Sequence, residues 1–250
     1  DPALPAWISR KLHDGIPRLF SDYTRLTGFA LGNRPSVLLS FRIAADPRST
    51  VWKGGTLPGI IQMHVEAAVD APEDLALMRR FYKFLCHEAA HLWNAQLFRS
   101  DGRNQSWMHE GGADAFAWRA MRRAGLIDET ELEDRQAEDL NECLARLGED
   151  SLQTAEERKD FRAVYSCGTA LAWLTEAGTR RVDPSSDLHT FWAALFRAAE
   201  PKGRRYDETA YLALLRERKV APATVSFIDD FINRKMPGRV ERTLFAFQDA

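Results

Sequence analysis

Two histidines and a glutamate that could support metal chemistry lie in five consecutive residues, His87-Glu88-Ala89-Ala90-His91. On a helix, residues four apart share a face, so both imidazoles can bind a single ion. A carboxylate directly after the first histidine is placed to take a proton from a metal-activated water. The pattern predicts a zinc hydrolase with His87 and His91 as ligands and Glu88 as general base.

A catalytic zinc site needs a third protein ligand and one open position. Glu110 is the candidate, with eighteen residues between it and His91 that include a polar loop. If the two flanking helices run antiparallel, Glu110 returns to the histidine face of the first helix. Gly111 and Gly112 would allow the backbone to approach the metal closely. The neighbouring His109 competes, but adjacent helical residues point about 100° apart, so only one of the two can face the ion. The sequence favours Glu110.

Asp114 follows Glu110 by one helical turn and shares its face. Zinc-bound histidines usually donate their second ring N–H to a carboxylate or carbonyl group. We therefore expect Asp114 to orient a ligand, most simply His87. An aspartate zinc ligand, either Asp101 or Asp114, is the alternative.

These motifs resemble those of the gluzincin metallopeptidases. The wording H-E-x-x-H-x-W-N, the spacing to Glu110 and the E-G-x-x-D pattern are similar to the aminopeptidase and glycyl-aminopeptidase branches. In those families a tyrosine on a later helix, followed by two residues and a glycine, donates a hydrogen bond to the tetrahedral intermediate. Tyr165-Ser166-Cys167-Gly168 fits this pattern. The resemblance covers roughly residues 75–180. It implies a thermolysin-like catalytic domain with one Zn²⁺ held by His87, His91 and Glu110, and Tyr165 as the oxyanion donor.

The segment before the zinc helix departs from that pattern, because no G-A-M-E-N exopeptidase element precedes it. The predicted strand Gly59–Glu66 could serve as a substrate-binding edge strand, with Glu66 a candidate anchor for a substrate amino terminus, although charged strand ends are usually only solvated. We expect a peptide or protein substrate, with aminopeptidase action slightly favoured over endopeptidase action. The alternative is a non-catalytic zincin-fold binding module that keeps zinc for structure.

The elements that must position these residues predict an α+β, zincin-like fold. Residues 1–72 form a part-β lobe with one or two helices over 5–27, interrupted near Pro17, strands at 37–43 and 59–66, and a loop around Val51-Trp52. Residues 73–250 form a helical lobe within the same single domain. Its zinc helix begins near Asp70 to Asp74, with Pro72 in the first turn. The further helices are expected at about 108–124, 128–147, 154–178, 187–199, 207–218 and 222–234, with capping pairs at Asp128/Glu131 and Thr154/Glu157. Residues 240–247 fit a strand or a helix.

Composition excludes several partners. The chain has 250 residues and a formal net charge of -2, which gives no electrostatic reason to expect nucleic acid or an anionic membrane. It contains no apolar run long enough to span a bilayer. Cys86, Cys143 and Cys167 lack CxxC spacing and predict buried free thiols, which weakly favours a reducing compartment. The start at Asp1-Pro2-Ala3, without an initiator Met or a signal peptide, fits a processed or trimmed chain and leaves compartment and oligomeric state open.

Overall fold

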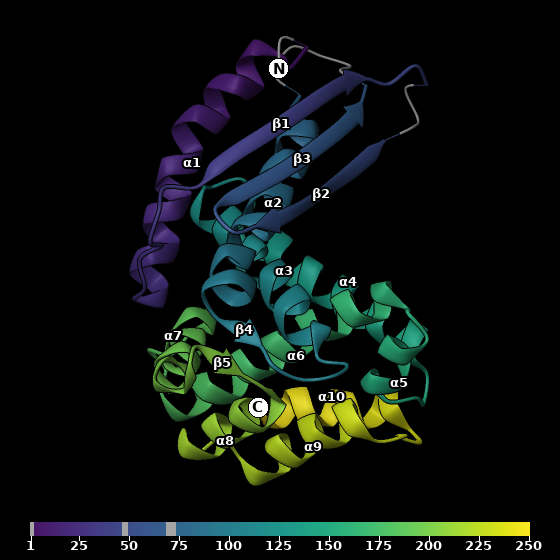
Figure 1. Cartoon of the computed structure of the whole chain (residues 1–250). Coiled ribbons are helices and arrows are strands. Elements are labelled where there is room, and N and C mark those ends of the chain that lie inside the picture. The colour runs from purple at the N-terminus through teal and green to yellow at the C-terminus, as the bar shows by residue number, and fades with distance from the viewer. Residues whose placement is uncertain (1–2, 47–49, 69–73) are drawn as a thin grey trace.

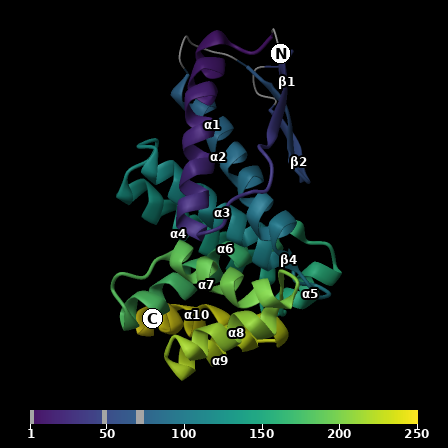
Figure 2. The same cartoon turned by 60° about the vertical axis from the view of Figure 1, so that its left-hand side comes forward.

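A three-stranded sheet lies at one end of the molecule and helices form the rest (Figure 1). The computed structural model describes residues 3–46, 50–68 and 74–250. The strands are β1 (Ser36–Ile43), β2 (Val51–Leu57) and β3 (Ile60–Ala67), in the order β1-β3-β2. β1 runs parallel to β3 and β2 runs antiparallel to it. The helix α1 (Ala6–Thr27) and the helix α2 (Leu75–His91), which carries His87 and His91, lie on one side of the sheet (Figure 2).

The alternation of side chains in β3 explains how the sheet meets these helices. Ile61, Met63, Val65 and Ala67 are buried, whereas the intervening side chains are more exposed. Side chains in a strand alternate between its two faces, so one face of β3 enters the core. The strands predicted at 37–43 and 59–66 are both present.

The prediction of a loop around Val51-Trp52 is wrong, because these residues begin the strand β2. Glycines are typical of turns, but Gly54 is a close-packing position in this strand. A Cβ at Gly54 would lie 2.5 Å from Cζ of Phe84 on α2 and 2.7 Å from the backbone oxygen of Gln62 on β3. The strand therefore needs glycine there to approach both neighbours.

The prediction that the strand at 59–66 is an edge strand is also wrong. β3 is the central strand, so β2 and not Gly59–Glu66 is the sheet edge beside α2. The carboxylate of Glu66 binds the guanidinium of Arg42 on β1, with 2.5 Å between Oε2 and Nη2. The carboxylate of Glu66 is thus engaged in an ion pair within the sheet and not directed at a substrate amino terminus.

The remaining elements are helical apart from two short strands. They are the π-helix Leu92–Leu97, β4 (Arg99–Ser100), α3 (Ser106–Arg123), α4 (Glu129–Leu147), α5 (Leu152–Glu157), α6 (Phe161–Val182), α7 (Leu188–Ala199), the 3₁₀ turn Glu200–Lys202, β5 (Arg205–Tyr206), α8 (Glu208–Glu217), α9 (Pro222–Asn233) and α10 (Arg239–Asp249). β4 pairs with β5 in parallel. Within the described residues, no helix combines the length and the apolar character needed to cross a membrane.

Several predicted helix boundaries hold and others do not. Asp128 and Glu131 form the expected capping box of α4. The helix expected over 154–178 is two helices, because Ser151 caps α5, Asp160 caps α6, and Lys159 between them has a positive φ of 60°.

Both terminal segments of the chain are helical. α1 passes through Pro17 as one helix, and the undecided tail is the helix α10. α2 is capped by Asp74, whose side chain accepts from the backbone N–H of Leu77. The proposed start signals Asp70 and Pro72 lie outside the described residues.

Glycines bring α3 and α6 into backbone contact. A Cβ at Gly111 would lie 2.2 Å from the carbonyl carbon of Gly168, and a Cβ at Gly168 would lie 2.3 Å from the backbone oxygen of Trp107. Gly112 faces the indole of Trp192, 2.5 Å from the position of a Cβ. These glycines, expected beside a metal, instead serve helix packing. They set the spacing of the two helices that carry Glu110 and Tyr165.

A disulfide between Cys143 and Cys167 joins α4 to α6, so the expectation of three free thiols is wrong. Only Cys86 is a free, buried thiol among the described residues. The two half-cystines belong to different helices, and their adjacency depends on how α4 packs on α6. The argument for a reducing compartment therefore loses its basis, because disulfides persist in oxidising surroundings.

Replacing both half-cystines, Cys143→Ala with Cys167→Ala, should lower the free energy of unfolding by about 3 kcal/mol, because a cross-link restricts the unfolded chain. Urea unfolding of the wild type and the double variant measures the difference, and Cys86→Ala serves as the control for loss of a buried sulfur. Three free thiols in the unfolded, non-reduced wild type would contradict the disulfide.

Candidate metal centre

Three side chains from α2 and α3 converge on one point. His87 and His91 lie on the last turns of α2, and Glu110 lies on the first turns of α3. Their ligand atoms all fall within 4.8 Å of one another. Nε2 of His87 is 3.0 Å from Nε2 of His91, and each is 3.3 Å from Oε2 of Glu110. Two ligand atoms bound tetrahedrally at about 2.0–2.1 Å from one ion lie about 3.3 Å apart, so this spacing fits one metal ion.

The hydrogen bonds behind the two histidines determine which ring nitrogens face inward. Nδ1 of His87 lies 2.8 Å from Oδ1 of Asp114, and Nδ1 of His91 lies 3.1 Å from Oδ1 of Asn94. The amide of Asn94 is oriented by its donation to the backbone oxygen of His109 at 2.8 Å. Carboxylate and amide oxygens accept, so each histidine carries its proton on Nδ1 and presents a lone pair at Nε2.

When both rings are neutral, three acceptor atoms therefore face one another. Oε2 of Glu110 is buried and has no hydrogen-bond partner among the described residues. His87 and His91 are 6% and 8% exposed. Buried acceptors need a proton or a cation, so the chemistry of this donor set fits a divalent metal. The buried cluster of His87, His91 and Glu110 could hold a metal ion.

Glu110 is held in its ionised form. Burial raises the pKa of its carboxyl group, but the contacts with the imidazoles of His109, His87 and His91 lower it by more, so the pKa lies well below the ordinary value. Nε2 of His109 lies 3.5 Å from Oε1, the other carboxylate oxygen. His109 is thus beside the cluster but outside it, which agrees with the preference for Glu110 as third ligand.

Asp114 connects the first histidine to a lysine. Its Oδ1 accepts from Nζ of Lys83 as well as from His87. Burial would raise the pKa of Asp114, but the charges of Lys83 and His87 lower it well below its usual range. Burial lowers the pKa of His87, but Asp114 raises it by more, to about 9, so without a metal ion the ring keeps a second proton that a bound ion would replace. Asp114 thus contacts the ring of His87 and is not in the three-residue cluster. Asp101 pairs with Arg205 on β5, at 2.8 Å.

Glu88 extends from α2 toward the edge strand. Its side chain is buried, and Oε2 lies 3.0 Å from Oγ1 of Thr56 on β2. The same hydroxyl lies 2.7 Å from the backbone oxygen of Glu88, so its one proton serves one of the two at a time. The backbone oxygen of Thr56 accepts from Nε2 of Gln96 at 3.2 Å. The sequence gives no signal for Thr56, because residues 51–57 resemble a loop.

Tyr165 lies over the first histidine. Its ring stacks on that of His87, with 5.7 Å between centroids and 13° between planes. Burial raises the pKa of the phenol far above its ordinary value, and the negative charge of Glu110 raises it further. Tyr165 therefore keeps its proton and can act as a donor next to the cluster.

A cleft of about 1340 Å³ opens beside the cluster. Its lining includes His87, Glu88, Asp114 and Tyr165. The general-base candidate and the donor candidate thus face the same space, which a peptide could enter.

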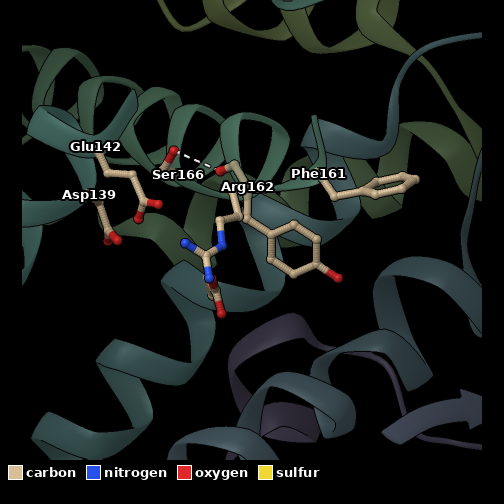
Figure 3. Close-up of a pocket in the computed structure, with 7 residues that line it drawn as sticks. Asp139, Glu142, Phe161, Arg162 and Ser166 are labelled. Carbon is tan, nitrogen blue, oxygen red and sulfur yellow. Dashed lines mark hydrogen bonds between the residues drawn. The ribbon is translucent and has the colours of Figure 1, made fainter. Parts of the chain in front are cut away.

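A second, smaller cavity of about 410 Å³ adjoins Tyr165 and Asp114 (Figure 3). Asp139 and Glu142 of α4 lie on one side of Arg162, and Phe161 lies on the other (Figure 3). Burial raises the pKa of Asp139 to about 7, and the charge of Asp114 adds to the shift. Oδ2 of Asp139 is buried without a hydrogen-bond partner among the described residues.

Comparison with solved structures finds the crystal structure of an aminopeptidase N family protein from Idiomarina loihiensis. The two chains are 14% identical and superpose with a TM-score of 0.72 over 91% of this chain and 43% of that one. The protein is thus an α+β chain similar in fold to that protein, and it spans less than half of that protein's length. No protein-family model matches the sequence, and no curated protein matches it.

Replacing Asp139 by Asn should stabilise the protein more at pH 8 than at pH 5. The folded pKa of about 7 lies above the ordinary 3.8. The carboxyl group's contribution to stability is therefore fully present below pH 3.8 and is lost as the pH rises through 7. Asn carries no charge, so the gain at pH 8 should be on the order of 2 kcal/mol.

Urea unfolding of both proteins at the two pH values measures this difference. Glu133→Gln, at an exposed position of the same helix, controls for the loss of one carboxylate. An equal effect of Asp139→Asn at pH 5 and pH 8 would contradict the prediction.

Proposed function

We propose that this chain is a zinc metallopeptidase that hydrolyses peptide bonds. The observation that carries the proposal is the convergence of three buried acceptors, His87 Nε2, His91 Nε2 and Glu110 Oε2, on one point beside a cleft. The fold similarity to an aminopeptidase N family protein supports peptidase-like chemistry. We also propose a thermolysin-like zincin arrangement in a single domain, which one continuous cluster of buried apolar residues, from Ile8 to Ala246, supports.

His87, His91 and Glu110 would hold the ion. Two imidazoles and one carboxylate with a fourth position free form a donor set typical of hydrolytic zinc. When bound, zinc would polarise the substrate carbonyl and lower the pKa of water. Asp114 and Asn94 fix the orientations of the two rings through their Nδ1 protons, which keeps both Nε2 lone pairs directed at the ion.

Glu88 is the proposed general base. It follows His87 directly, faces the cleft and belongs to no ion pair among the described residues, so its carboxylate is available to take a proton from water and pass it to the leaving amine. The Thr56 hydroxyl, 3.0 Å from Oε2, limits the rotation of this carboxylate. Tyr165 keeps its phenol proton and would donate it in a hydrogen bond to the oxyanion.

The edge strand β2 offers a place for the substrate backbone. Alternate residues of an edge strand direct their backbone groups outward. The carbonyl of Thr56 faces outward, because it accepts from Gln96. Gly54, two residues earlier, then presents its N–H and C=O on the same side, and it lines the cleft. A peptide can pair there as an added strand.

The direction of the cleft favours exopeptidase action. Its lining follows α2 from Glu88 back to Leu75, and among the described residues none from the π-helix Leu92–Leu97 contributes. Space on one side of the ion fits removal of a terminal residue, and we retain aminopeptidase action as slightly favoured over endopeptidase action. A non-catalytic module that binds zinc for structure is the alternative.

The variant Glu88→Gln should lose peptide hydrolysis by roughly 10²–10⁴-fold, since the general base is removed. It should still bind one zinc per chain, because Glu88 is outside the ligand cluster. Elemental analysis and cleavage of a peptide library with free and blocked amino termini measure both effects.

The ligand variants His91→Ala and Glu110→Gln are the matched controls, and both should lose the metal. Wild type that holds no metal after purification with zinc would refute the proposal. Wild type that binds zinc but cleaves no peptide would favour the structural module.

The variant Tyr165→Phe should lower kcat by roughly 10²–10³-fold, because one donor to the oxyanion is lost. KM should change little if the phenol acts only in the transition state. Steady-state kinetics on the best peptide from the library measure both constants, and an unchanged kcat would show that Tyr165 has another role.

A further inference from the structure

One face of α2 forms the floor of the cleft. The lining residues of this helix recur three and four positions apart, at Leu75, Ala76, Arg79, Arg80, Lys83, Phe84, His87 and Glu88. This spacing places them on a single stripe. The cleft therefore follows the helix from the metal ligands toward its N-terminus.

Basic side chains are concentrated along this route, at Arg79, Arg80 and Lys83 on α2 and at Arg135 on α4. Two of them are neutralised inside the cleft. Nη1 of Arg79 lies 2.9 Å from Oε1 of Glu131, and Lys83 binds Asp114.

The other two cations have no carboxylate partner inside the cleft. Arg80 is exposed and forms no ion pair within the described part of the chain. Arg135 pairs with Glu138, which is not a lining residue. The guanidinium of Arg135 lies 5.8 Å from the ring centre of Trp118, which also lines the cleft.

Lys53 also lines the cleft, but its position in β2 directs its side chain to the other face of the sheet. It pairs in register with His64, whose ring contacts Ser40 across the open face of the sheet. Its neighbour Trp52 packs against Phe81 of α2, with 5.1 Å between ring centres. Strand alternation therefore directs the Lys53 side chain away from α2. The cleft charge comes from Arg80 and Arg135.

The helices give the distance of these two arginines from the reaction centre. Arg80 precedes Glu88 by eight residues, and Trp118, beneath Arg135, follows Glu110 by eight. Eight residues of helix span about 12 Å. α2 and α3 lie antiparallel, since Asp114 reaches back to Lys83 and His87. Both arginines thus lie in the same direction, and an extended peptide covers about 12 Å in three to four residues.

We propose that the cleft selects peptides with a carboxylate at the third or fourth residue beyond the cleaved bond, and that Arg80 and Arg135 bind it. The inference rests on the proposed aminopeptidase action, in which the amino-terminal residue sits at the metal and the rest of the peptide follows α2. The carboxylate is an acidic side chain of a longer peptide or the C-terminus of a short one. Arginine suits either, through paired N–H donors.

A position scan tests this proposal. In hexapeptide amides with one Glu moved through residues 2 to 6, kcat/KM should be highest with Glu at residue 4 or 5, roughly three- to tenfold above the matching Gln peptide. Tetra- and pentapeptides with free C-termini should exceed their amides by a similar factor. The preference should weaken in high salt, because the cleft is open to solvent.

The double variant Arg80→Gln with Arg135→Gln should bring the Glu-to-Gln ratio close to one, and Arg80→Glu should reverse it. Arg216→Gln, an exposed position on α8, is the matched control and should keep the wild-type ratio. A flat scan in the wild type, or an unchanged ratio in the double variant, overturns the proposal even if neutral peptides are cleaved.

Binding separates this proposal from the proposed function. Fluorescence anisotropy with the zinc-loaded Glu88→Gln variant compares labelled Glu and Gln hexapeptides without turnover. Tighter binding of the Glu peptide supports the carboxylate site even if the wild type hydrolyses nothing. Equal binding overturns it.

Discussion

The contact between Gly111 and Gly168 sets the geometry on which the candidate site depends. It brings the backbones of α3 and α6 so close that a Cβ at Gly111 would lie 2.2 Å from its neighbour. Glu110 precedes the first glycine by one residue, and Tyr165 precedes the second by one turn. The helix that carries Glu110 and the helix that carries Tyr165 are therefore placed by one crossing. The disulfide at Cys167 joins α6 to α4 beside the same point.

Charge balance imposes the second constraint. The charges of Lys83 and Asp114 neutralise each other, and Asp114 also contacts the ring of His87, whereas the Nε2 lone pairs of the neutral histidines and the Glu110 oxygen have no partner among the described residues. Leaving buried acceptors unmatched costs free energy. A bound cation would remove this cost, so the same arrangement that prepares the chemistry also links folded stability to metal concentration.

Features that depend on residues close in sequence could be predicted, whereas features that depend on contacts between distant segments could not. The placement of His87, His91, Glu110 and Asp114 depends on helical spacing and one helix pair, and these residues do come together. Tyr165 came from a family resemblance, and its stacking on His87 agrees with that placement. Thr56 could not be found, because glycines that pack β2 against α2 resemble turn signals in the sequence. The disulfide depends on the α4–α6 crossing, which no local pattern encodes. The edge position of β2 depends on strand order, which is also non-local.

The short span of the ligand set has a consequence for folding. All three residues of the cluster lie within positions 87–110, so a chain that has formed only α2 and α3 already carries every ligand. Contacts close in sequence form fastest, because little chain entropy is lost in closing the loop. Ion capture therefore need not wait for the sheet or α6, whereas Thr56 and Tyr165 reach the site only when those distant segments dock. If the cluster binds the proposed metal ion, the ion would first stabilise the α2–α3 helix pair, before Thr56 and Tyr165 are in place.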